Sequence, residues 1–352
     1  MPTAELYGRK NQKSEKQRKG LGRRQNPGTD NWYIMASLQI PADFLLEVPP
    51  NASMRKIDFM YTSPPIPAFK NHYAAVVDNF MTKDECEQLL RLAEEAAEVG
   101  RPDSHSSPIW ERAMVNAGNG KEVLLVDYRN CGRIIWDSHD LGQRLLNRLM
   151  PFLHEFNIHR INNQPILTGL GPATRGEVFH LTQLNERLRF LRYEGGEYFR
   201  PHCDGTYITP DGSERSLFTI HLYLSGDGEQ DLEELRREIE QAERRDGLYE
   251  HHNVEIDLKE LASDVDKAKN KSRELFTAST RPSDQAETLL GGTTSFLAGK
   301  KAVRIFPTAG SVLIFQQRDM FHGGDDVFRG VKYTMRTDIM YRKETNDVGE
   351  SF

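Results

Sequence analysis

The feature that most constrains the fold is a pair of short extended runs joined at Gly195-Gly196 within Leu188–Asp204. Both runs are rich in residues that favour strands, and the glycine pair is a turn signal. Side chains alternate between the two faces of a strand, so His202 and Asp204 are expected to point the same way and Cys203 the opposite way. The stretch therefore places an imidazole and a carboxylate one pleat apart on one strand face.

A second histidine, His322, follows the strand-like run Gly310–Gln316. Two neutral imidazoles and one carboxylate form the facial triad that suits non-haem Fe(II) and leaves adjacent coordination positions open. The chain has eleven histidines, so an isolated His-x-Asp tripeptide could also arise by chance. The sequence predicts a metal site at His202, Asp204 and His322, with coincidence as the alternative.

Basic residues follow His322 on a further predicted strand, Arg329–Tyr341. With a period of two, Lys332, Thr334 and Arg336 share one face, and apolar residues occupy most of the other. A cation on an inward face is costly unless an anion meets it. A dicarboxylate cosubstrate would be such an anion.

The segment 188–341 resembles the catalytic domain of the prolyl 4-hydroxylase branch of the 2-oxoglutarate/Fe(II) dioxygenases. The matching motifs are Tyr193-x-x-Gly196-x-Tyr198-x-x-Pro201-His202-x-Asp204, Gly291-Gly-Thr-Thr-Ser-Phe296, Phe306-Pro with Gly310-Ser-Val-Leu-Ile-Phe315, and His322 with Gly330-Val-Lys332-Tyr. Residues 75–86 resemble the first strand and first helix of that family. The resemblance covers residues 72–343.

The resemblance implies an α+β fold: a double-stranded β-helix, or jelly-roll, core with packed N-terminal helices and a helical insertion. It implies Fe(II), 2-oxoglutarate and O2, with ascorbate as an optional reductant, and hydroxylation of an unactivated C–H with release of succinate and CO2. The site residues that follow are Fe(II) ligands His202, Asp204 and His322, and 2-oxoglutarate contacts Tyr193, Lys332, Arg336 and Thr219. The substrate stays open between a prolyl residue of a peptide or protein and a small metabolite. A non-catalytic binding protein that keeps the fold is a further alternative.

Lys332 and Arg336 compete for the C5 carboxylate of 2-oxoglutarate. They lie about 13 Å apart along a strand at roughly 3.3 Å per residue, so one carboxylate is not shared between them. Lys332 is favoured because it has the family's position relative to His322. Arg336 would then pair with Asp338 or another inward carboxylate, whereas a bidentate arginine grip is the competing view.

The termini and the insertion set the expected domain boundaries. Residues 1–34 are predicted to be a disordered basic tail, either a nuclear-localisation or anion-seeking segment or a solvated leader, and Met35 is an alternative start. Residues 35–71 should form a proline-rich extended arm, residues 72–343 the catalytic domain, and residues 344–352 a C-terminal tail. Residues 228–290 depart from the family pattern. Their helical spacing predicts a hairpin, read as a lid, a partner-docking arm or a tolerated surface insertion.

Two helices and an irregular region are expected before the core strands. Thr82-Lys-Asp-Glu85 is a capping box, and a second helix should run near 139–153. The stretch from Trp110 to Trp136 is expected to be irregular, with Trp110, Arg129 and Asn130 as substrate contacts or packing residues. His221, on a predicted strand with Thr219, is read as a fourth ligand or as a hydrogen-bonded barrel histidine.

The net charge and the cysteines limit the binding partners and the cellular location that can be expected. A formal net charge of -6 argues against a dedicated nucleic-acid binder. Three cysteines that match no zinc spacing indicate reduced thiols, hence a cytoplasmic or nuclear protein. No apolar run reaches the roughly eighteen residues of a membrane span. The expected partners are the substrate and at most a weak homodimer of an otherwise monomeric chain.

Overall fold

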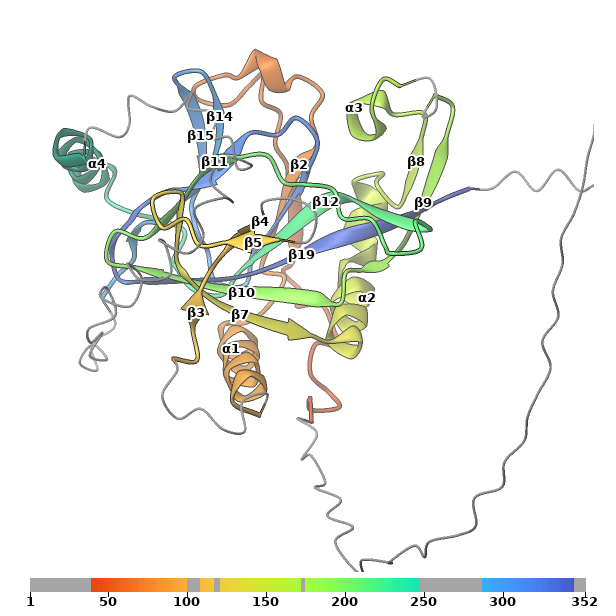
Figure 1. Cartoon of the computed structure of the whole chain (residues 1–352), viewed down its shortest axis with the longest axis horizontal. Helices are drawn as coiled ribbons and strands as arrows, with labels where there is room; N and C mark the ends of the chain where they lie inside the picture. The colour runs from red at the N-terminus through yellow and green to blue at the C-terminus, as the bar shows by residue number, and fades with distance from the viewer. Residues whose placement is uncertain (1–38, 100–107, 117–120, 172–174, 247–286, 345–352) are drawn as a thin grey trace, which may run out of the picture. The chain divides into compact units, whose positions relative to one another are not determined.

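Antiparallel strands in two main sheets carry the fold (Figure 1). The computed structural model describes residues 39–99, 108–116, 121–171, 175–246 and 287–344, and all statements below concern these residues. The large sheet has the order β1 (Ser53–Lys56), β2 (Ala74–Asp78), β16 (Val312–Gln316), β12 (Glu214–Tyr223), β19 (Val331–Lys343), β10 (Arg187–Glu194), β7 (Gly132–Asp137) and β3 (Glu111–Arg112). β9 (Val178–Leu184) also pairs with β19, and β8 (Arg160–Asn162) pairs with β9.

The small sheet has the order β15 (Lys301–Ile305), β14 (Thr294–Ala298), β17 (His322–Gly324), β11 (Tyr198–His202) and β6 (Arg129–Asn130). Two ribbons complete the strands: β13 (Leu290–Gly291) with β18 (Val327–Arg329), and β4 (Val115–Asn116) with β5 (Glu122–Val123). The chain passes repeatedly between the sheets, giving β10-β19-β12-β16 in one and β11-β17-β14-β15 in the other. Two antiparallel sheets wound in this way form a jelly roll, so the predicted fold class is confirmed.

Strand β19 is the longest of the described strands. One of its faces packs on the main apolar cluster, and the other faces the interior of the barrel. Its register places Lys332 opposite Tyr193 of β10, and Arg336 opposite His221 of β12. Met335 and Ile339, on the other face, are buried in the main apolar cluster, as the period of two predicted. The alternation therefore directs Lys332 and Arg336 into the barrel.

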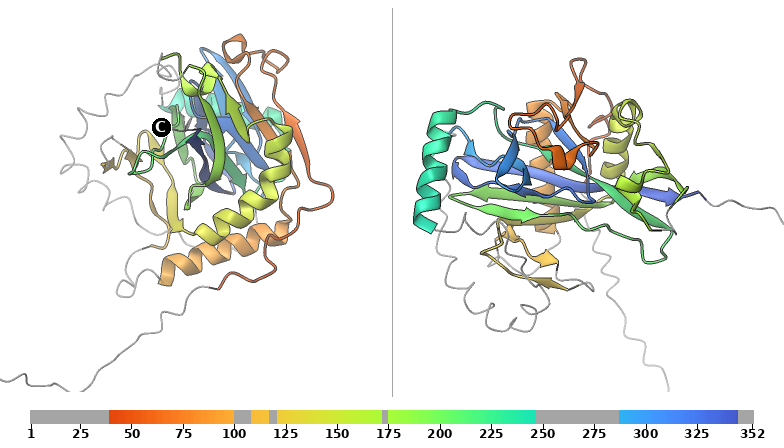
Figure 2. Two further views of the ribbon diagram at one scale, coloured as in Figure 1. Left: turned by 90° about the vertical axis from the view of Figure 1, so that its right-hand side faces the viewer. Right: turned by 90° about the horizontal axis from the view of Figure 1, so that it is seen from above.

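Helices α1 (Lys83–Val99) and α2 (His139–Glu155) lie side by side along the large sheet (Figure 2). The predicted capping box opens α1: the Thr82 backbone N–H donates to Glu85 Oε2 at 2.8 Å, and the Glu85 N–H donates to Thr82 Oγ1 at 3.1 Å. Arg148 of α2 donates to both Glu85 oxygens, at 3.0 and 2.8 Å. Glu85 of the capping box at the start of α1 therefore also holds α2 in place through Arg148. No helix in this described part of the chain is long and apolar enough to cross a membrane.

The segment before β2 is built into the core. It contains β1, paired with β2, and the short 3-10 helix η1 (Pro67–Phe69). Phe59 and Ile66 are buried in an apolar cluster with side chains of both sheets. The part of the predicted extended arm that the structure describes therefore contributes a strand and buried apolar groups.

Two local predictions require correction. Residues 110–136 were expected to be irregular, but they contain β3 to β7, and β7 pairs along β10. Strands of two residues show no alternation, which hides them in the sequence. The strand that carries His202 ends at that residue, so Asp204 lies just beyond it rather than within it.

The insertion begins with α4 (Leu232–Asp246), which lies at one end of the sheets (Figure 2), whereas the second helical stretch falls outside the described residues. Leu235 is buried, and Glu234 pairs with Arg329 of β18. The two ends of the insertion meet: Gln230 Nε2 donates to the Gly291 carbonyl at 2.9 Å, and the Gly291 N–H donates to Gln230 Oε1 at 2.7 Å. The insertion therefore leaves and re-enters the barrel at one place. A further short helix, α3 (Pro165–Thr168), precedes β9.

Candidate metal centre

Three side chains with metal-ligand atoms converge at the mouth of the barrel: His202 at the end of β11, Asp204 after it, and His322 at the start of β17. Cross-strand pairing puts His202 directly opposite His322. Each imidazole Nε2 lies 3.6 Å from one oxygen of Asp204, and the three ligand atoms lie within 4.8 Å of one another. The predicted triad is therefore assembled in space.

Both histidines are oriented by backbone carbonyls. His202 Nδ1 lies 2.9 Å from the Arg200 carbonyl, and His322 Nδ1 lies 2.9 Å from the Met320 carbonyl. A carbonyl only accepts, so each Nδ1–H donates to its carbonyl and each Nε2 faces Asp204. Burial lowers the pKa of His322 to about 4, so this ring is neutral at pH 7.

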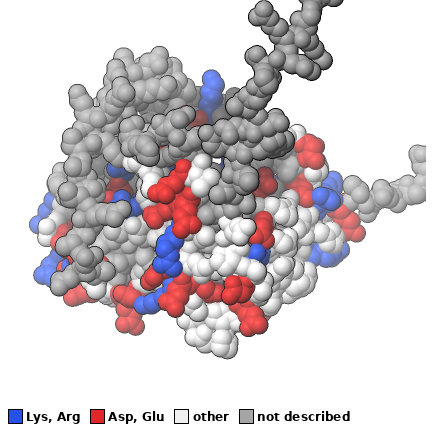
Figure 3. Space-filling view, turned by 90° about the horizontal axis from the view of Figure 1, so that it is seen from below, with Lys and Arg blue, Asp and Glu red and all other residues white. Residues whose placement is uncertain are grey.

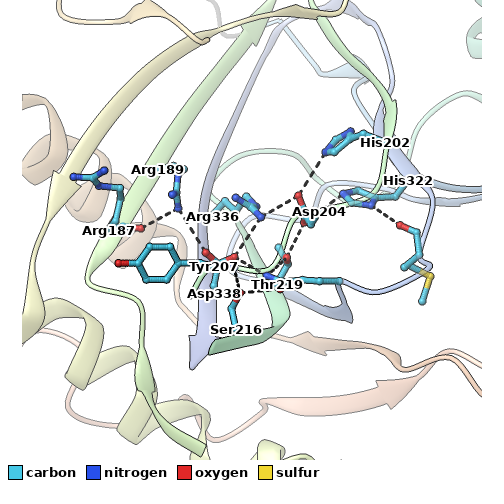
Figure 4. A network of polar contacts seen from close by, with 12 residues as sticks. Arg187, Arg189, His202, Asp204, Tyr207, Ser216, Thr219, His322, Arg336 and Asp338 are labelled. Carbon is cyan, nitrogen blue, oxygen red and sulfur yellow. Dashed lines mark hydrogen bonds and ion pairs between the residues drawn. The ribbon is translucent and has the colours of Figure 1, made fainter. Parts of the chain in front are cut away.

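The carboxylate of Asp204 is held from two sides (Figure 4). Arg336 donates to Asp204 Oδ1 at 2.9 Å, and the Thr219 hydroxyl donates to Oδ2 at 2.7 Å. Burial opposes ionisation of Asp204, but the Arg336 guanidinium outweighs it and holds the pKa of this carboxyl well below its usual range. Asp204 is therefore an ionised, positioned ligand.

This donor set fits Fe(II). Two imidazole nitrogens and one carboxylate oxygen are the ligands of the non-haem ferrous facial triad. The carbonyls on the imidazoles, with Arg336 and Thr219 on Asp204, supply the outer hydrogen bonds that orient such ligands. The triad would hold the metal on one wall of a cavity.

That cavity has a volume of about 540 Å³ and also contains Lys332 and Tyr193. The Lys332 side chain is 2 % exposed, and Nζ lies 5.1 Å from the centre of the Tyr193 ring. Among the described residues, no carboxylate lies within ion-pair distance of Nζ. Burial lowers the pKa of Lys332 to about 8, with Asp325 partly opposing the shift. A buried cation without a carboxylate is a ready site for an anionic ligand.

The other predicted cosubstrate contacts have different partners. Arg336 pairs with Asp338 at 3.2 Å as well as with Asp204, so it is engaged with inward carboxylates. The Thr219 hydroxyl donates to Asp204, and its role as a contact of 2-oxoglutarate stays a prediction. His221 also lines the cavity, and its buried Nδ1 has no hydrogen-bond partner in the described structure. The prediction that the His221 ring is hydrogen-bonded is therefore wrong for its Nδ1 atom.

Of the three candidate substrate contacts, only Arg129 lines the cavity. The Trp110 indole donates to Glu94 at 2.9 Å, and the Asn130 side chain accepts from Arg112. Two further lining arginines, Arg133 and Arg189, went unpredicted. The signal for Arg189 was available, because it shares a strand face with Tyr193 at a spacing of four residues.

Comparison with known proteins gives structural similarity only. No family model matches the sequence, and no curated protein matches it. Among solved structures, the chain is similar to a prolyl-4-hydroxylase of Pseudomonas putida, with 14% identity, a TM-score of 0.38, and coverage of 77% of this chain and 94% of that one. It is similar to the viral collagen prolyl hydroxylase of Paramecium Bursaria Chlorella virus-1 in its 2OG complex, with 14% identity, a TM-score of 0.36, and coverage of 77% and 97%. It is also similar to a prolyl hydroxylase of Trichoplax adhaerens in complex with a hypoxia inducible factor peptide fragment, with 11% identity, a TM-score of 0.39, and coverage of 77% and 84%. At these values, the reaction has to be inferred from the residues of the cavity.

Proposed function

We propose that this chain is a 2-oxoglutarate- and Fe(II)-dependent dioxygenase that hydroxylates an unactivated C–H. The observation that carries the proposal is the presence, in one cavity, of the triad His202, Asp204 and His322 and the buried, carboxylate-free cation Lys332. The triad fits a ferrous ion, and the cation fits the far carboxylate of a dicarboxylate. A metal site or a basic pocket alone would leave many functions open.

The residues of the cavity would bind the metal, bind the cosubstrate and position Asp204. The bound iron would supply the O2 chemistry that couples oxidative decarboxylation of 2-oxoglutarate to hydroxylation. Asp204 and the two histidines would hold the metal, and Lys332 would bind the C5 carboxylate as a compact point charge. Tyr193, buried beside Lys332, would add a phenolic hydrogen bond. Arg336 keeps Asp204 ionised and in place, which favours Lys332 over Arg336 as the cosubstrate cation.

Prolyl hydroxylation of a peptide or protein is the reaction suggested by the sequence motifs, and oxidation of a small metabolite is the alternative. A peptide requires an open groove at the metal, whereas a metabolite requires a closed pocket. We also propose that ascorbate serves as an optional reductant, that the chain is a monomer or a weak homodimer, and that the protein is cytoplasmic or nuclear.

The test is cosubstrate turnover. Purified protein with Fe(II), O2 and 2-oxoglutarate is assayed for succinate by mass spectrometry, against His322→Ala and the exposed-histidine control His180→Ala. His180 is about half exposed and lies outside the cavity. The proposal predicts metal-dependent succinate in wild type and His180→Ala and its loss in His322→Ala. Wild-type protein that binds Fe(II) and 2-oxoglutarate in titrations but forms no succinate would refute catalysis and leave the non-catalytic alternative, whereas protein that binds neither ligand would refute both.

A further inference from the structure

The charges that line the cavity are out of balance. Its cations are Arg129, Arg133, Arg189, Lys332 and Arg336, and its carboxylates are Glu122, Asp204 and Asp338, which gives a formal charge of +2. The whole chain carries -6. On the face in Figure 3, acidic and basic side chains lie among one another. The positive excess is therefore a property of the cavity.

The proposed metal and cosubstrate leave this excess in place. Fe(II) adds two positive charges and the 2-oxoglutarate dianion adds two negative charges, so together they cancel. The loaded cavity would still hold two more cations than anions. Charges taken out of water are stable only when they are paired, so a further anion is expected in the cavity.

Three arginines form a group near the metal ligands, here called the arginine cluster: Arg129 of β6, Arg133 of β7 and Arg189 of β10. Arg189 has only long contacts, with the Arg187 carbonyl at 3.5 Å and with Asp338 Oδ2 at 3.7 Å (Figure 4). Burial, and then the neighbouring Arg336 guanidinium, lower the pKa of Arg189 to about 10. Arg189 is therefore a guanidinium with capacity to bind an anion.

Arg129 is 9 % exposed, and its Nε has no hydrogen-bond partner in the described residues. Its Nη1 donates to the Met114 carbonyl at 3.2 Å, and its guanidinium carbon lies 4.5 Å from the centre of the Phe199 ring. Phe199 in turn stacks on the His202 imidazole with ring centres 3.8 Å apart. One aromatic ring thus separates this buried, incompletely bonded arginine from a metal ligand.

The third arginine, Arg133, already binds a carboxylate within the cluster. Arg133 donates from both terminal nitrogens to the two oxygens of Glu122, each at 3.0 Å. Arg133 is buried, whereas the Glu122 side chain is 40% exposed. The fork-on-carboxylate geometry is the one that arginine uses to bind carboxylates and phosphates in general.

We infer that the substrate carries a carboxylate or phosphate group that binds the arginine cluster, with Arg189 and Arg129 as its main contacts. The inference rests on the proposed function and specifies its substrate class. Arg189 lies opposite Arg336, whereas Tyr193 lies opposite Lys332, so about 13 Å of strand separates the two cationic ends at roughly 3.3 Å per residue. The two ends therefore bind different anions. The substrate anion comes either from a free metabolite or from an acidic side chain of a peptide.

The experiment measures binding by calorimetry, with Mn(II) in place of Fe(II) and saturating 2-oxoglutarate. The free probes are the N-acetyl methylamides of aspartate and phosphoserine, paired with the neutral N-acetyl methylamides of asparagine and serine. The peptide probe is Gly-Asp-Gly with an acetylated N-terminus and an amidated C-terminus, paired with Gly-Asn-Gly capped in the same way. The variants are Arg189→Gln and Arg129→Gln. The matched control is Arg187→Gln on the same strand, because Arg187 is 50% exposed and lies outside the cavity.

Wild type and Arg187→Gln are expected to bind at least one acidic probe about tenfold more tightly than its neutral partner. That preference should vanish in Arg189→Gln and Arg129→Gln, while both variants remain folded by circular dichroism and keep the wild-type affinity for 2-oxoglutarate. An acidic preference among the free probes identifies a free metabolite as the source of the anion, and a preference between the peptide probes identifies an acidic side chain of a peptide. The inference is overturned if protein that binds Mn(II) and 2-oxoglutarate shows no acidic preference, or if the preference persists in both arginine variants. Failure of 2-oxoglutarate itself to bind removes the proposed function, and this inference with it.

Discussion

Lys332 and Arg336 show how neighbouring cations on one strand face take different roles. Arg336 has two carboxylates within 3.2 Å, Asp204 and Asp338, and is part of the framework of the metal centre. Lys332 has aromatic rings around Nζ instead, those of Tyr193 and Tyr223. Desolvation without a carboxylate partner makes its charge depend on pH in the range where enzymes work.

The pH dependence of 2-oxoglutarate binding should report Lys332. Its pKa in the folded protein is about 8, below the ordinary 10.5. The protonated side chain binds the carboxylate, so we expect the KM for 2-oxoglutarate to be lowest below pH 8 and to rise by up to about tenfold per pH unit above it. Between pH 8 and 10.5 the unfolded chain binds more protons than the folded one, so this residue makes folding more favourable as pH rises. Steady-state kinetics from pH 6.5 to 9.5 would check the KM, and a flat profile would assign the role elsewhere.

Removing each cation in turn separates their roles. Lys332→Ala should raise the KM for 2-oxoglutarate by about a hundredfold, since a desolvated charge-assisted contact contributes roughly 1.5–3 kcal/mol. Arg336→Ala should instead weaken Fe(II) binding and lower stability, because Asp204 and Asp338 lose their shared partner. Titrations of cosubstrate and metal, with folding checked by circular dichroism, measure both. The reverse pattern would make Arg336 the cosubstrate cation.

At the scale of the elements, α1 and α2 are joined by one buried ion pair. Arg148 is 3 % exposed, and it also donates to the Phe80 carbonyl at 3.2 Å, just before α1 begins. Its partner Glu85 belongs to the capping box. The N-terminus of α1, the loop before it and the middle of α2 are thus held through a single guanidinium.

Arg148→Ala should lower the free energy of unfolding by about 3 kcal/mol, because it leaves Glu85 without its partner in a desolvated position. The control is Arg91→Ala on the surface of α1, whose contact with Glu87 is 3.7 Å long and exposed, so its loss should stay below about 0.5 kcal/mol. Urea denaturation would compare the two. Equal effects of both variants would contradict the role given to the pair.

The elements also show what local pattern can and cannot predict. The capping box, the second helix near 139–153 and the alternation of β19 depend on neighbours in sequence, and all three are found where they were expected. The His202–Asp204–His322 triad could be predicted because few residue types bind iron. The arginine cluster could not, because Arg129, Arg133 and Arg189 come from three strands in two sheets, and only their register brings them together. Strands as short as β4 and β5 likewise become visible only when paired.

At the scale of the whole molecule, the insertion is an addition to a closed barrel. Its ends are fastened by the two hydrogen bonds between Gln230 and Gly291, and α4 contacts the barrel through a few side chains, among them Leu235 and Glu234. The jelly-roll strands pair with one another without any contribution from it. The barrel is therefore expected to fold alone.

A variant in which a short Gly-Ser linker replaces residues 232–287 should fold and bind Fe(II) as wild type does. The loss of buried apolar side chains on α4 should cost about 2 kcal/mol of stability. Thermal melting, metal titration and succinate assays test this. Retained 2-oxoglutarate turnover without substrate oxidation would identify the insertion as a lid, whereas insoluble or unfolded protein would contradict its peripheral role.

The central claim is that Asp204 is a ligand of one iron per chain. Anaerobic Fe(II) titration of wild type, Asp204→Asn and the control Asp319→Asn tests it most directly. The Asp319 side chain is exposed, and this residue lies three positions before His322. Its backbone φ of 55° is one that asparagine also adopts, so the control substitution should not disturb the fold. Wild type and Asp319→Asn should bind one iron per chain, and Asp204→Asn should bind at least about tenfold more weakly, because the ligand loses its charge. Equal affinity in all three proteins would contradict the proposed metal centre.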